Sequence, residues 1–308
     1  MEAGGVEITE TGSPMSGREA SARRFDWTTL LLVGPCVILI VGFVIVPFFY
    51  ILRTSVTNVG PYGSIGSDWT LDNYRALADP VYIRIILNSL WLAAQNTIIC
   101  LLVGYPVAYF LAFRAGRMAG PLILLLVIPF WASFLVRMSA WMTLLSPGGI
   151  ADSTLQATRL VGEDAQLIPS HGAVLIGLLY VFLPSAVFPI YAALSGMQRS
   201  LLDAAGDLGC GPIRTHTHVI IPLGTKGLAA AVLFVFAPSL GVFVIPVLLG
   251  GGKDLIIGNL IVTLFLEFRN MPFGAAVSVV LVVLVALIAL LTLAGFTRRG
   301  RRQKQVTE

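Results

Sequence analysis

The chain has 308 residues, of which 56% are hydrophobic and only 12% are charged, and its formal net charge at pH 7 is +4. Soluble domains carry about 25% charged residues, so this chain has too few charges to cover a water-facing surface of its size. The composition therefore excludes an ordinary water-soluble enzyme and indicates an integral membrane protein. The three cysteines are widely spaced, which is typical of small buried residues rather than of a disulfide framework.

A polar tail, residues 1–27, begins the chain, and we expect it to be disordered. Six apolar stretches follow, each long enough to cross a bilayer as a helix, which takes about 20 residues. They are continuously apolar rather than alternating, which favours helices over the strands of a membrane barrel. The sequence thus predicts an all-α polytopic membrane protein with spans at 28–52, 86–113, 120–145, 172–194, 227–249 and 272–296, and a basic tail at 298–308. Bends in the fourth and fifth spans are permitted by Pro184, Pro189, Pro238, Gly241 and Pro246.

The distribution of Lys and Arg predicts the orientation in the membrane. With the N-terminus in the cytoplasm, thirteen of these residues fall on the cytoplasmic side and six on the outer side, while Arg137 lies within the third span. We therefore expect both termini in the cytoplasm. The basic C-terminal run is interpreted as a flank that contacts anionic lipid, in preference to a nucleic-acid site.

The most informative segment is the cytoplasmic loop between the fourth and fifth spans, residues 198–222. Ser200 is followed three positions later by Asp203, a capping-box pattern that predicts a short helix. Gly209 and Gly211 can end this helix, and Pro212 can open a second one because its missing N–H needs no partner there. We therefore expect a compact helix–turn–helix knob. A patch with almost no side-chain bulk, which a partner's backbone could approach closely, is predicted at Ala204, Ala205 and Gly206.

Judged from these residues alone, a docking knob and a solvated connector are equally compatible with the loop. The loop resembles the EAA loop of the inner-membrane permeases of ABC importers, in which Glu-Ala-Ala, three residues, Gly and nine residues precede Ile-x-Leu-Pro. Here the spacing is kept, with Asp replacing Glu, Val replacing Ile and Ile replacing Leu. The resemblance implies that the loop docks in a groove of a separate ATPase and couples its closure to the membrane helices through Asp203, Ala204, Ala205, Gly206, Gly209 and Pro222.

Four further stretches resemble the spermidine/putrescine branch of these permeases, and most closely its first permease subunit: 88–112, 128–145, 175–194 and 250–261. The resemblance implies the six-helix type I ABC importer fold and a location in the bacterial inner membrane. It also implies four partners: a second, related permease, two copies of an ATPase that binds ATP and Mg, and an extracytoplasmic substrate-binding protein.

Motifs of catalysis and of metal binding are missing from the sequence. No G-x-x-x-x-G-K-[ST] pattern occurs, because Gly252 and Lys253 are followed by Asp254, so ATP hydrolysis is expected in another subunit. His216 and His218 are two apart, and on a helix they would point about 200° away from each other. We therefore expect no cofactor and no metal site in this chain.

An aromatic stripe in the third span is a candidate for the substrate path. Trp131, Phe134, Met138 and Trp141 recur at helical spacing. Helix packing or an outer aromatic belt is the preferred interpretation, and a platform for a polyamine through cation–π contacts is the alternative. Arg137 lies beside the stripe, about 12 Å from the outer end of its span. Because the charge of Arg137 would repel a polycation, the sequence also allows the alternative that the permease carries thiamine, ferric iron or an anion.

No Asp or Glu lies within the six predicted spans, so acceptors for a cation would come from the outer loops or the partner permease. Asp254 and Glu267 are candidates, since they flank the apolar run 255–266, which is too short to cross the bilayer. This run is interpreted either as a segment that dips in from the outside at a gate or as an interfacial helix. The lack of intramembrane acids also argues against an ion-driven secondary transporter.

Overall fold

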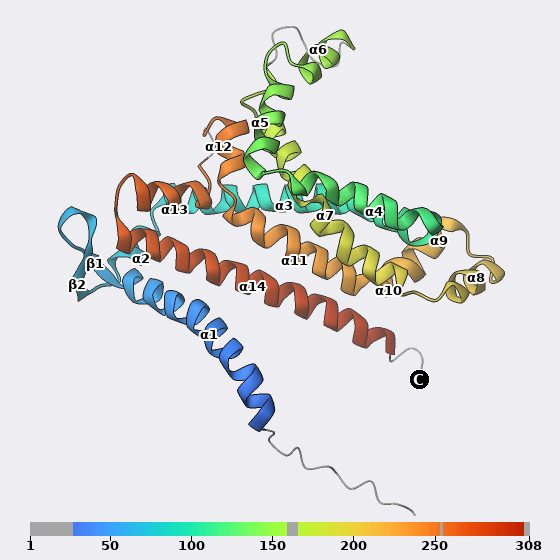
Figure 1. Cartoon of the computed structure of the whole chain (residues 1–308), viewed down its shortest axis with the longest axis horizontal. Coiled ribbons are helices and arrows are strands. Elements are labelled where there is room, and N and C mark those ends of the chain that lie inside the picture. The colour runs from blue at the N-terminus through green and yellow to red at the C-terminus, as the bar shows by residue number, and fades with distance from the viewer. Residues whose placement is uncertain (1–26, 159–165, 253–254, 305–308) are drawn as a thin grey trace, which may run out of the picture. The chain divides into compact units, whose positions relative to one another are not determined.

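The computed structural model describes residues 27–158, 166–252 and 255–304 (Figure 1). Its contacts divide the chain into two compact units, residues 1–49 and 50–308. The described part of the first unit belongs to helix α1 (Trp27–Ser55), which is apolar throughout and contains Pro35 and Pro47. The segment Val33–Ser55 is long enough and apolar enough to cross a membrane.

The second unit is built almost entirely from helices. The last residues of α1 are followed there by an antiparallel hairpin of β1 (Thr57–Val59) and β2 (Ile65–Trp69). The sequence predicted neither this hairpin nor the short helix after it. The helices that follow are α2 (Asp72–Ala76), α3 (Pro80–Tyr109), α4 (Ala119–Val127), α5 (Phe134–Leu145), α6 (Ile150–Ala157), α7 (His171–Ser195), α8 (Arg199–Asp207), α9 (Pro212–Thr215), α10 (Ile221–Leu223), α11 (Thr225–Gly241), α12 (Val244–Gly250), α13 (Ile257–Leu266) and α14 (Met271–Lys304).

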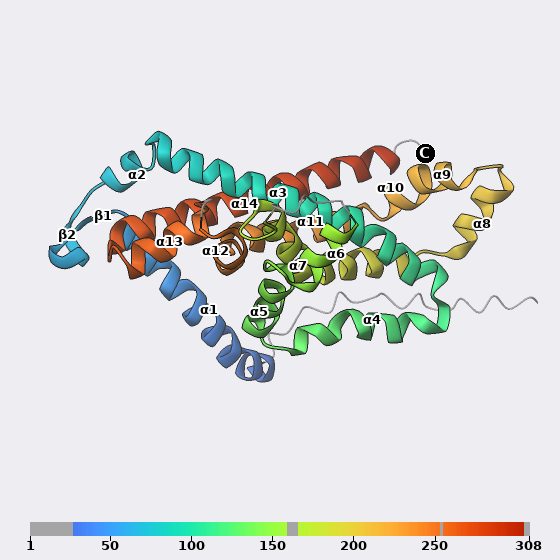
Figure 2. The ribbon, with the colours of Figure 1, turned by 90° about the horizontal axis from the view of Figure 1, so that it is seen from above.

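Helices α3, α7 and α11 form the centre of this unit and lie side by side in Figures 1 and 2. Each contributes one side chain to a fully buried apolar cluster, namely Cys100, Ala186 and Val235. Gly227 of α11 packs so closely on α7 that an added Cβ would lie 2.6 Å from the Pro189 carbonyl oxygen. Small residues that let helix backbones approach are the usual solution in membranes, where apolar side chains gain nothing by leaving lipid.

Short polar caps fix where two of these helices begin. Asp79 accepts a hydrogen bond from the Val81 amide at 2.8 Å, and Pro80 occupies the first position of α3. The Ser170 hydroxyl accepts from the Ala173 amide at 3.1 Å at the start of α7. From these starts, α3 and α7 run toward the end of the bundle that carries α8, opposite the β1–β2 hairpin (Figure 2).

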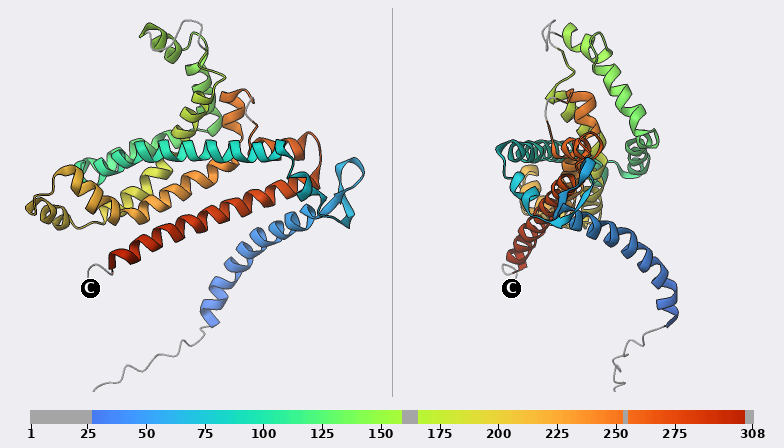
Figure 3. Two further views of the ribbon diagram at one scale, coloured as in Figure 1. Left: turned by 180° about the vertical axis from the view of Figure 1, so that it is seen from behind. Right: turned by 90° about the vertical axis from the view of Figure 1, so that its left-hand side faces the viewer.

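The prediction of a single continuous helix over 120–145 is wrong. Helix α4 continues through a 3-10 turn that ends at Trp131, and α5 begins at Phe134 after a bend of 93°. Pro129 lies in this turn, where it lacks an N–H donor and its ring crowds the preceding helical carbonyl, and Ala132 is extended. Helices α5 and α6 consequently lead away from the central bundle, as both views of Figure 3 show.

The fifth predicted helix, 227–249, is also interrupted. Helix α11 ends at Gly241, Val242 is extended, and α12 starts at Val244, so the break falls at a site where the sequence permitted a bend. At its other end α11 meets the segment Pro212–Leu223 at 69°. Among the described residues, four helices are long and apolar enough to cross a membrane, and two bent helix pairs raise the number to six if each pair makes one span.

Candidate functional site

The loop between α7 and α11 folds as a helix–turn–helix knob. Helix α8 ends in a Schellman motif, because the Cys210 amide donates to Ala205 O and the Gly209 amide donates to Gly206 O, both at 2.9 Å. Gly209 has a φ of +75°, a left-handed conformation that a side chain disfavours. Gly211 then caps α9, with Pro212 at its first turn. The predicted roles of Gly209 and Pro212 in the local fold are confirmed, whereas Gly211, predicted to help end the first helix, caps the start of the second one instead.

The start of α8 differs from the prediction. The helix begins at Arg199, its N-cap is Gln198, and no side chain caps it. Ser200 therefore lies inside the first turn, where it cannot form the capping box expected with Asp203. The end of the knob is as expected, since Pro222 lies in the short helix α10 and its carbonyl accepts from the Thr225 hydroxyl at 2.9 Å where the chain turns into α11.

The surface of the knob combines small residues with large apolar ones. Asp203, Ala204 and Gly206 are exposed, and nothing lies within 4 Å of a Cβ added to Gly206. Ala205 is buried instead, so it does not belong to the exposed patch predicted from the sequence. Sequence reasoning missed Leu208 and Ile213, which are 84% and 78% exposed.

The knob is packed firmly onto the ends of α3 and α7. A π-helical turn, His216–Ile220, follows α9. The His216 ring lies on the Tyr109 ring of α3, with 4.5 Å between the ring centroids. Ile220 is fully buried in an apolar cluster that includes Ala108 of α3 and Leu194 of α7. A displacement of the knob would therefore act directly on both helices.

The two histidines of the knob make local backbone contacts. His216 Nδ1 lies 3.1 Å from Pro212 O, and His218 Nδ1 lies 3.2 Å from Arg214 O. Among the residues that the structure describes, no group of three or more His, Cys, Asp or Glu side chains is placed to hold a metal ion.

The predicted aromatic stripe is divided by the bend between α4 and α5. Trp131 belongs to the turn after α4 and is exposed, whereas Phe134, Met138 and Trp141 belong to α5. Met138 is fully buried, and the Trp141 ring packs edge-on against Tyr180 of α7 at 5.5 Å. The α5 residues thus serve helix packing, and Trp131 is not part of their face.

Arg137 has an unusual environment on α5. Its guanidinium carbon lies 4.8 Å from the Phe130 ring centroid and 5.9 Å from that of Phe134. Two of its nitrogens, Nε and Nη1, are buried without a hydrogen-bond partner among the described residues. A desolvated cation of this kind is costly unless an anion or acceptor is supplied from elsewhere.

The short apolar run after Asp254 forms α13, which is packed inside the unit. The Ile257 amide donates to the Ser89 hydroxyl of α3 at 2.8 Å. Gly258 packs directly against the break in the fifth predicted helix, and the contact leaves no room for a side chain. A Cβ at this position would lie 2.9 Å from both Gly241 O and Val242 O. Asn259 is buried, and its Oδ1 has no partner in the described part of the chain. Glu267 is exposed at the end of α13, and Asp254 lies outside the described residues.

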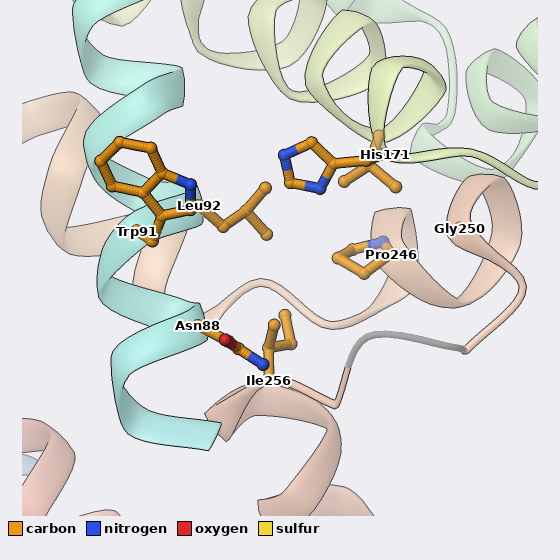
Figure 4. Close-up of a pocket in the computed structure, with 8 residues that line it drawn as sticks. Asn88, Trp91, Leu92, His171, Pro246, Gly250 and Ile256 are labelled. Carbon is orange, nitrogen blue, oxygen red and sulfur yellow. The ribbon is translucent and has the colours of Figure 1, made fainter. Parts of the chain in front are cut away.

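A cavity of about 160 Å³ opens between α3, α7 and α12 (Figure 4). Trp91 and His171 extend into it from opposite sides, with Asn88 beside Ile256. His171 Nε2 lies 2.8 Å from Gln95 Oε1. Sequence reasoning missed this site, although Asn88, Trp91 and Gln95 follow a helical spacing of three and four residues along α3 that could have indicated a polar face. The lining residues within the described part of the chain are Asn88, Trp91, Leu92, His171, Val174, Pro246, Gly250 and Ile256.

The fold is similar to that of solved ABC transporters. It matches a bacterial ABC transporter involved in the import of the acidic polysaccharide alginate with a TM-score of 0.72, at 17% identity, over 89% of this chain and 96% of that one. The bacterial alginate transporter in complex with its alginate pentasaccharide-bound periplasmic protein matches with a TM-score of 0.71, at 17% identity, over 87% and 93% of the two chains. At this identity the likeness establishes the fold alone.

No family model matches the chain, but proteins with similar sequences identify its class. The chain is 34% identical to the inner membrane ABC transporter permease protein YdcU of Escherichia coli (strain K12), over 70% of this chain and 73% of that protein. These likenesses define a multi-pass integral membrane permease of the ABC transporter class.

A second group of relatives places the chain within that class. Identity is 38% to the spermidine/putrescine transport system permease protein PotB of Escherichia coli (strain K12), over 79% of this chain and 88% of that protein. It is 36% to PotB of Haemophilus influenzae, over 79% and 85%. The chain belongs to the PotB family of permeases.

Proposed function

We propose that this chain is the permease subunit of an ATP-driven importer of polyamines and forms half of the translocation pathway. The observation that carries the proposal is the EAA-type loop, folded as an exposed knob with Leu208 and Ile213 at its surface. The substrate class is carried over from the PotB relatives, whose names specify spermidine and putrescine. The chain itself is a transporter subunit, and ATP with its Mg is held by a separate ATPase.

The proposed topology has six spans with both termini in the cytoplasm of a bacterium and the spans in its inner membrane. Each of the two bent helix pairs then crosses the membrane once. The excess of Lys and Arg on the knob side supports this orientation. It puts the β1–β2 hairpin and the start of α7 on the outer side, where a substrate-binding protein would dock.

The proposed mechanism is alternating access, driven by ATPases on the cytoplasmic side of the membrane. Two ATPase copies close on ATP binding, and the groove of one of them moves the knob around Asp203 to Gly209. His216 and Ile220 pass this movement to α3 and α7, because both side chains pack on those helices. A second, related permease forms the other half of the pathway, and the two arrangements of the pair open it outward or inward.

Acceptors for a cationic substrate are proposed on the outer side. Glu267 is exposed at the end of α13, and Asp254 precedes that helix, so the two carboxylates would raise the local concentration of a polycation. Trp131 is the aromatic candidate for the path, since it is exposed. Phe134 and Trp141 would affect the substrate path only indirectly, by packing α5 in place.

The knob can be tested with a bulky residue at a position that has space in the isolated chain. We expect Gly206→Trp to fold, because nothing lies within 4 Å of its Cβ position, and to abolish ATP-driven spermidine uptake by proteoliposomes containing the complete transporter. The matched control is Gly120→Trp, in the first turn of α4, where a Cβ also has open space. Equal uptake by the two variants would contradict docking at the knob. Uptake that needs a proton gradient but no ATP would favour a secondary transporter instead.

A further inference from the structure

We propose that the cavity lined by Asn88, Trp91 and His171 is a binding site for one terminal ammonium group and the alkyl chain that carries it. This inference rests on the proposed function and adds the place in this chain where one end of the polyamine is held. In this inference the first residues to bind the ammonium group lie on α3. They are not acidic, and they differ from the aromatic residues Trp131, Phe134 and Trp141 discussed above.

The cavity lies at the membrane face opposite the knob. Helix α7 starts at His171, which lines the cavity, and ends at Ser195, just before the knob. Its 25 residues make it about 37 Å long at 1.5 Å per residue. The hydrocarbon core is about 30 Å thick. With the knob in the cytoplasm, the cavity therefore opens at the outer end of the pathway, where a binding protein releases its cargo.

The chemistry of the lining suits an ammonium group. An ammonium ion donates hydrogen bonds and is attracted to the face of an indole ring. Trp91 is 63% exposed, so its ring is accessible, and Asn88, which lines the same cavity beside Ile256, supplies a side-chain carbonyl as an acceptor. Among the lining residues that the structure describes, none is Lys, Arg, Asp or Glu.

The wall opposite Trp91 is held in place by a hydrogen bond. The Gln95 carbonyl oxygen can only accept, so His171 Nε2 donates to it across 2.8 Å. Trp91 and Gln95 are four residues apart on α3 and share one face of the helix. The imidazole and the indole thus stand on two sides of the same space, as Figure 4 shows, and an alkyl chain can lie between them.

The size of the cavity limits what it can hold. A protein cavity of about 150 Å³ accommodates benzene, which has six heavy atoms, and this cavity has about 160 Å³. An aminopropyl or aminobutyl arm has four or five heavy atoms and fits, whereas whole spermidine does not. One arm would therefore be bound here while the rest of the molecule extends toward the pathway.

The test measures equilibrium binding of radiolabelled spermidine to the purified complete transporter without its binding protein. We expect Trp91→Ala to weaken binding about fivefold, the size of a typical cation–π contact, and Trp91→Phe to keep most of the affinity. Asn88→Leu should weaken binding as well, and n-butylammonium should compete with spermidine. The matched control is Trp69→Ala, since Trp69 is 70% exposed but lies on β2, away from the cavity lining.

Three outcomes would overturn the inference. These are unchanged affinity in both Trp91→Ala and Asn88→Leu, an equal loss in Trp69→Ala, and no competition by n-butylammonium. Any of them can occur while the unmodified transporter still imports spermidine with ATP, so the site can fail without the proposed function failing. If the unmodified transporter shows no ATP-driven polyamine uptake, the proposed function itself is wrong.

Discussion

The side-chain amide of Asn96 on α3 donates a hydrogen bond of 2.8 Å to the hydroxyl of Ser239 on α11, and both residues are buried. The Ser239 hydroxyl in turn donates to Val235 O within its own helix. The Asn96 carbonyl lies 3.5 Å from Cys100 Sγ. This polar link joins two helices of the central bundle at a place where lipid offers no alternative partner.

Ser239→Ala should destabilise the chain, because it leaves the Asn96 amide buried with an unpaired N–H. Interhelical hydrogen bonds in membranes contribute about 0.6 to 1.7 kcal/mol, and an unsatisfied buried donor costs about 1 to 3 kcal/mol. We expect a loss of about 1 kcal/mol in the free energy of unfolding, measured by denaturant titration in detergent. Ser278→Ala is the control, since the Ser278 hydroxyl donates only to Gly274 O of its own helix. Equal losses in the two variants would argue against the interhelical contribution.

Gly258→Ala tests how α13 fits the broken fifth helix. A methyl group at this position would lie 2.9 Å from two backbone oxygens, Gly241 O and Val242 O, and neither can move without shifting the end of α11. Overpacking of this kind costs about 1 to 3 kcal/mol, so we expect a lower melting temperature and reduced uptake. Gly241→Ala, where nothing lies within 4 Å of the Cβ position, should melt close to the temperature of the unmodified chain. The reverse order of the two melting temperatures would contradict the packing described.

Arg137→Met should stabilise the detergent-solubilised chain. The substitution removes a cation whose Nε and Nη1 are buried without partners in the described residues, and it keeps an unbranched side chain near the Phe130 and Phe134 rings. Replacing buried charge by apolar volume is often neutral or stabilising by about 1 to 4 kcal/mol. We expect a gain of about 1 kcal/mol in the unfolding free energy.

The control for this change is Arg114→Met, because Arg114 is exposed and surface substitutions stay within about 0.5 kcal/mol. A large loss of stability in Arg137→Met would mean that the guanidinium is already satisfied within the chain.

The carboxyl of Asp72, at the start of α2, should titrate below its usual range. The Thr70 hydroxyl donates to it at 2.8 Å, and Arg75 adds an ion pair at 3.0 Å, so the pKa of Asp72 is lowered from its ordinary value of 3.8. A lowered pKa means that the ionised form stabilises the fold above pH 3.8 and that this contribution is lost as the pH falls through the folded-state value.

Thr70→Val should move the pKa of Asp72 back up, because it removes the first of these two interactions. Carboxyl carbon NMR titration of the chain in nanodiscs measures the shift, with Ser67→Ala as a control beside Asp68, to which Ser67 donates. No upward movement in Thr70→Val would assign the effect to Arg75 alone.

The sequence predicted those parts of the site whose structure depends only on residues that are adjacent along the chain. Gly209 and Pro212 fix the turn of the knob through their own backbone conformations, so their positions alone were sufficient. The bend at 132–133 could not be predicted in this way, because a proline such as Pro129 is tolerated in many membrane helices when neighbours satisfy the backbone. The angle of 93° depends on what α5 packs against.

The cavity was missed for a related reason. Its walls come from α3, α7 and α12, and Trp91 and His171 are distant in the sequence. Single-sequence periodicity gives the face of one helix but not the face that it meets. The same limit applies to Gly258, whose requirement for a small side chain arises from carbonyls of another helix.

His216→Ala should separate ATP hydrolysis from transport. The His216 ring lies 4.5 Å from the Tyr109 ring of α3, so its removal loosens the contact through which, in the proposed mechanism, the knob moves that helix. In proteoliposomes with the complete transporter we expect near-normal ATPase activity, because the exposed docking surface is unchanged, and a severalfold drop in spermidine imported per ATP hydrolysed. His218→Ala is the matched control, because His218 is exposed two residues away and its ring bonds to Thr217 and Arg214. The same ratio of transport to hydrolysis in both variants would show that movement of the knob reaches α3 by another route, with the buried Ile220 as the next contact to replace.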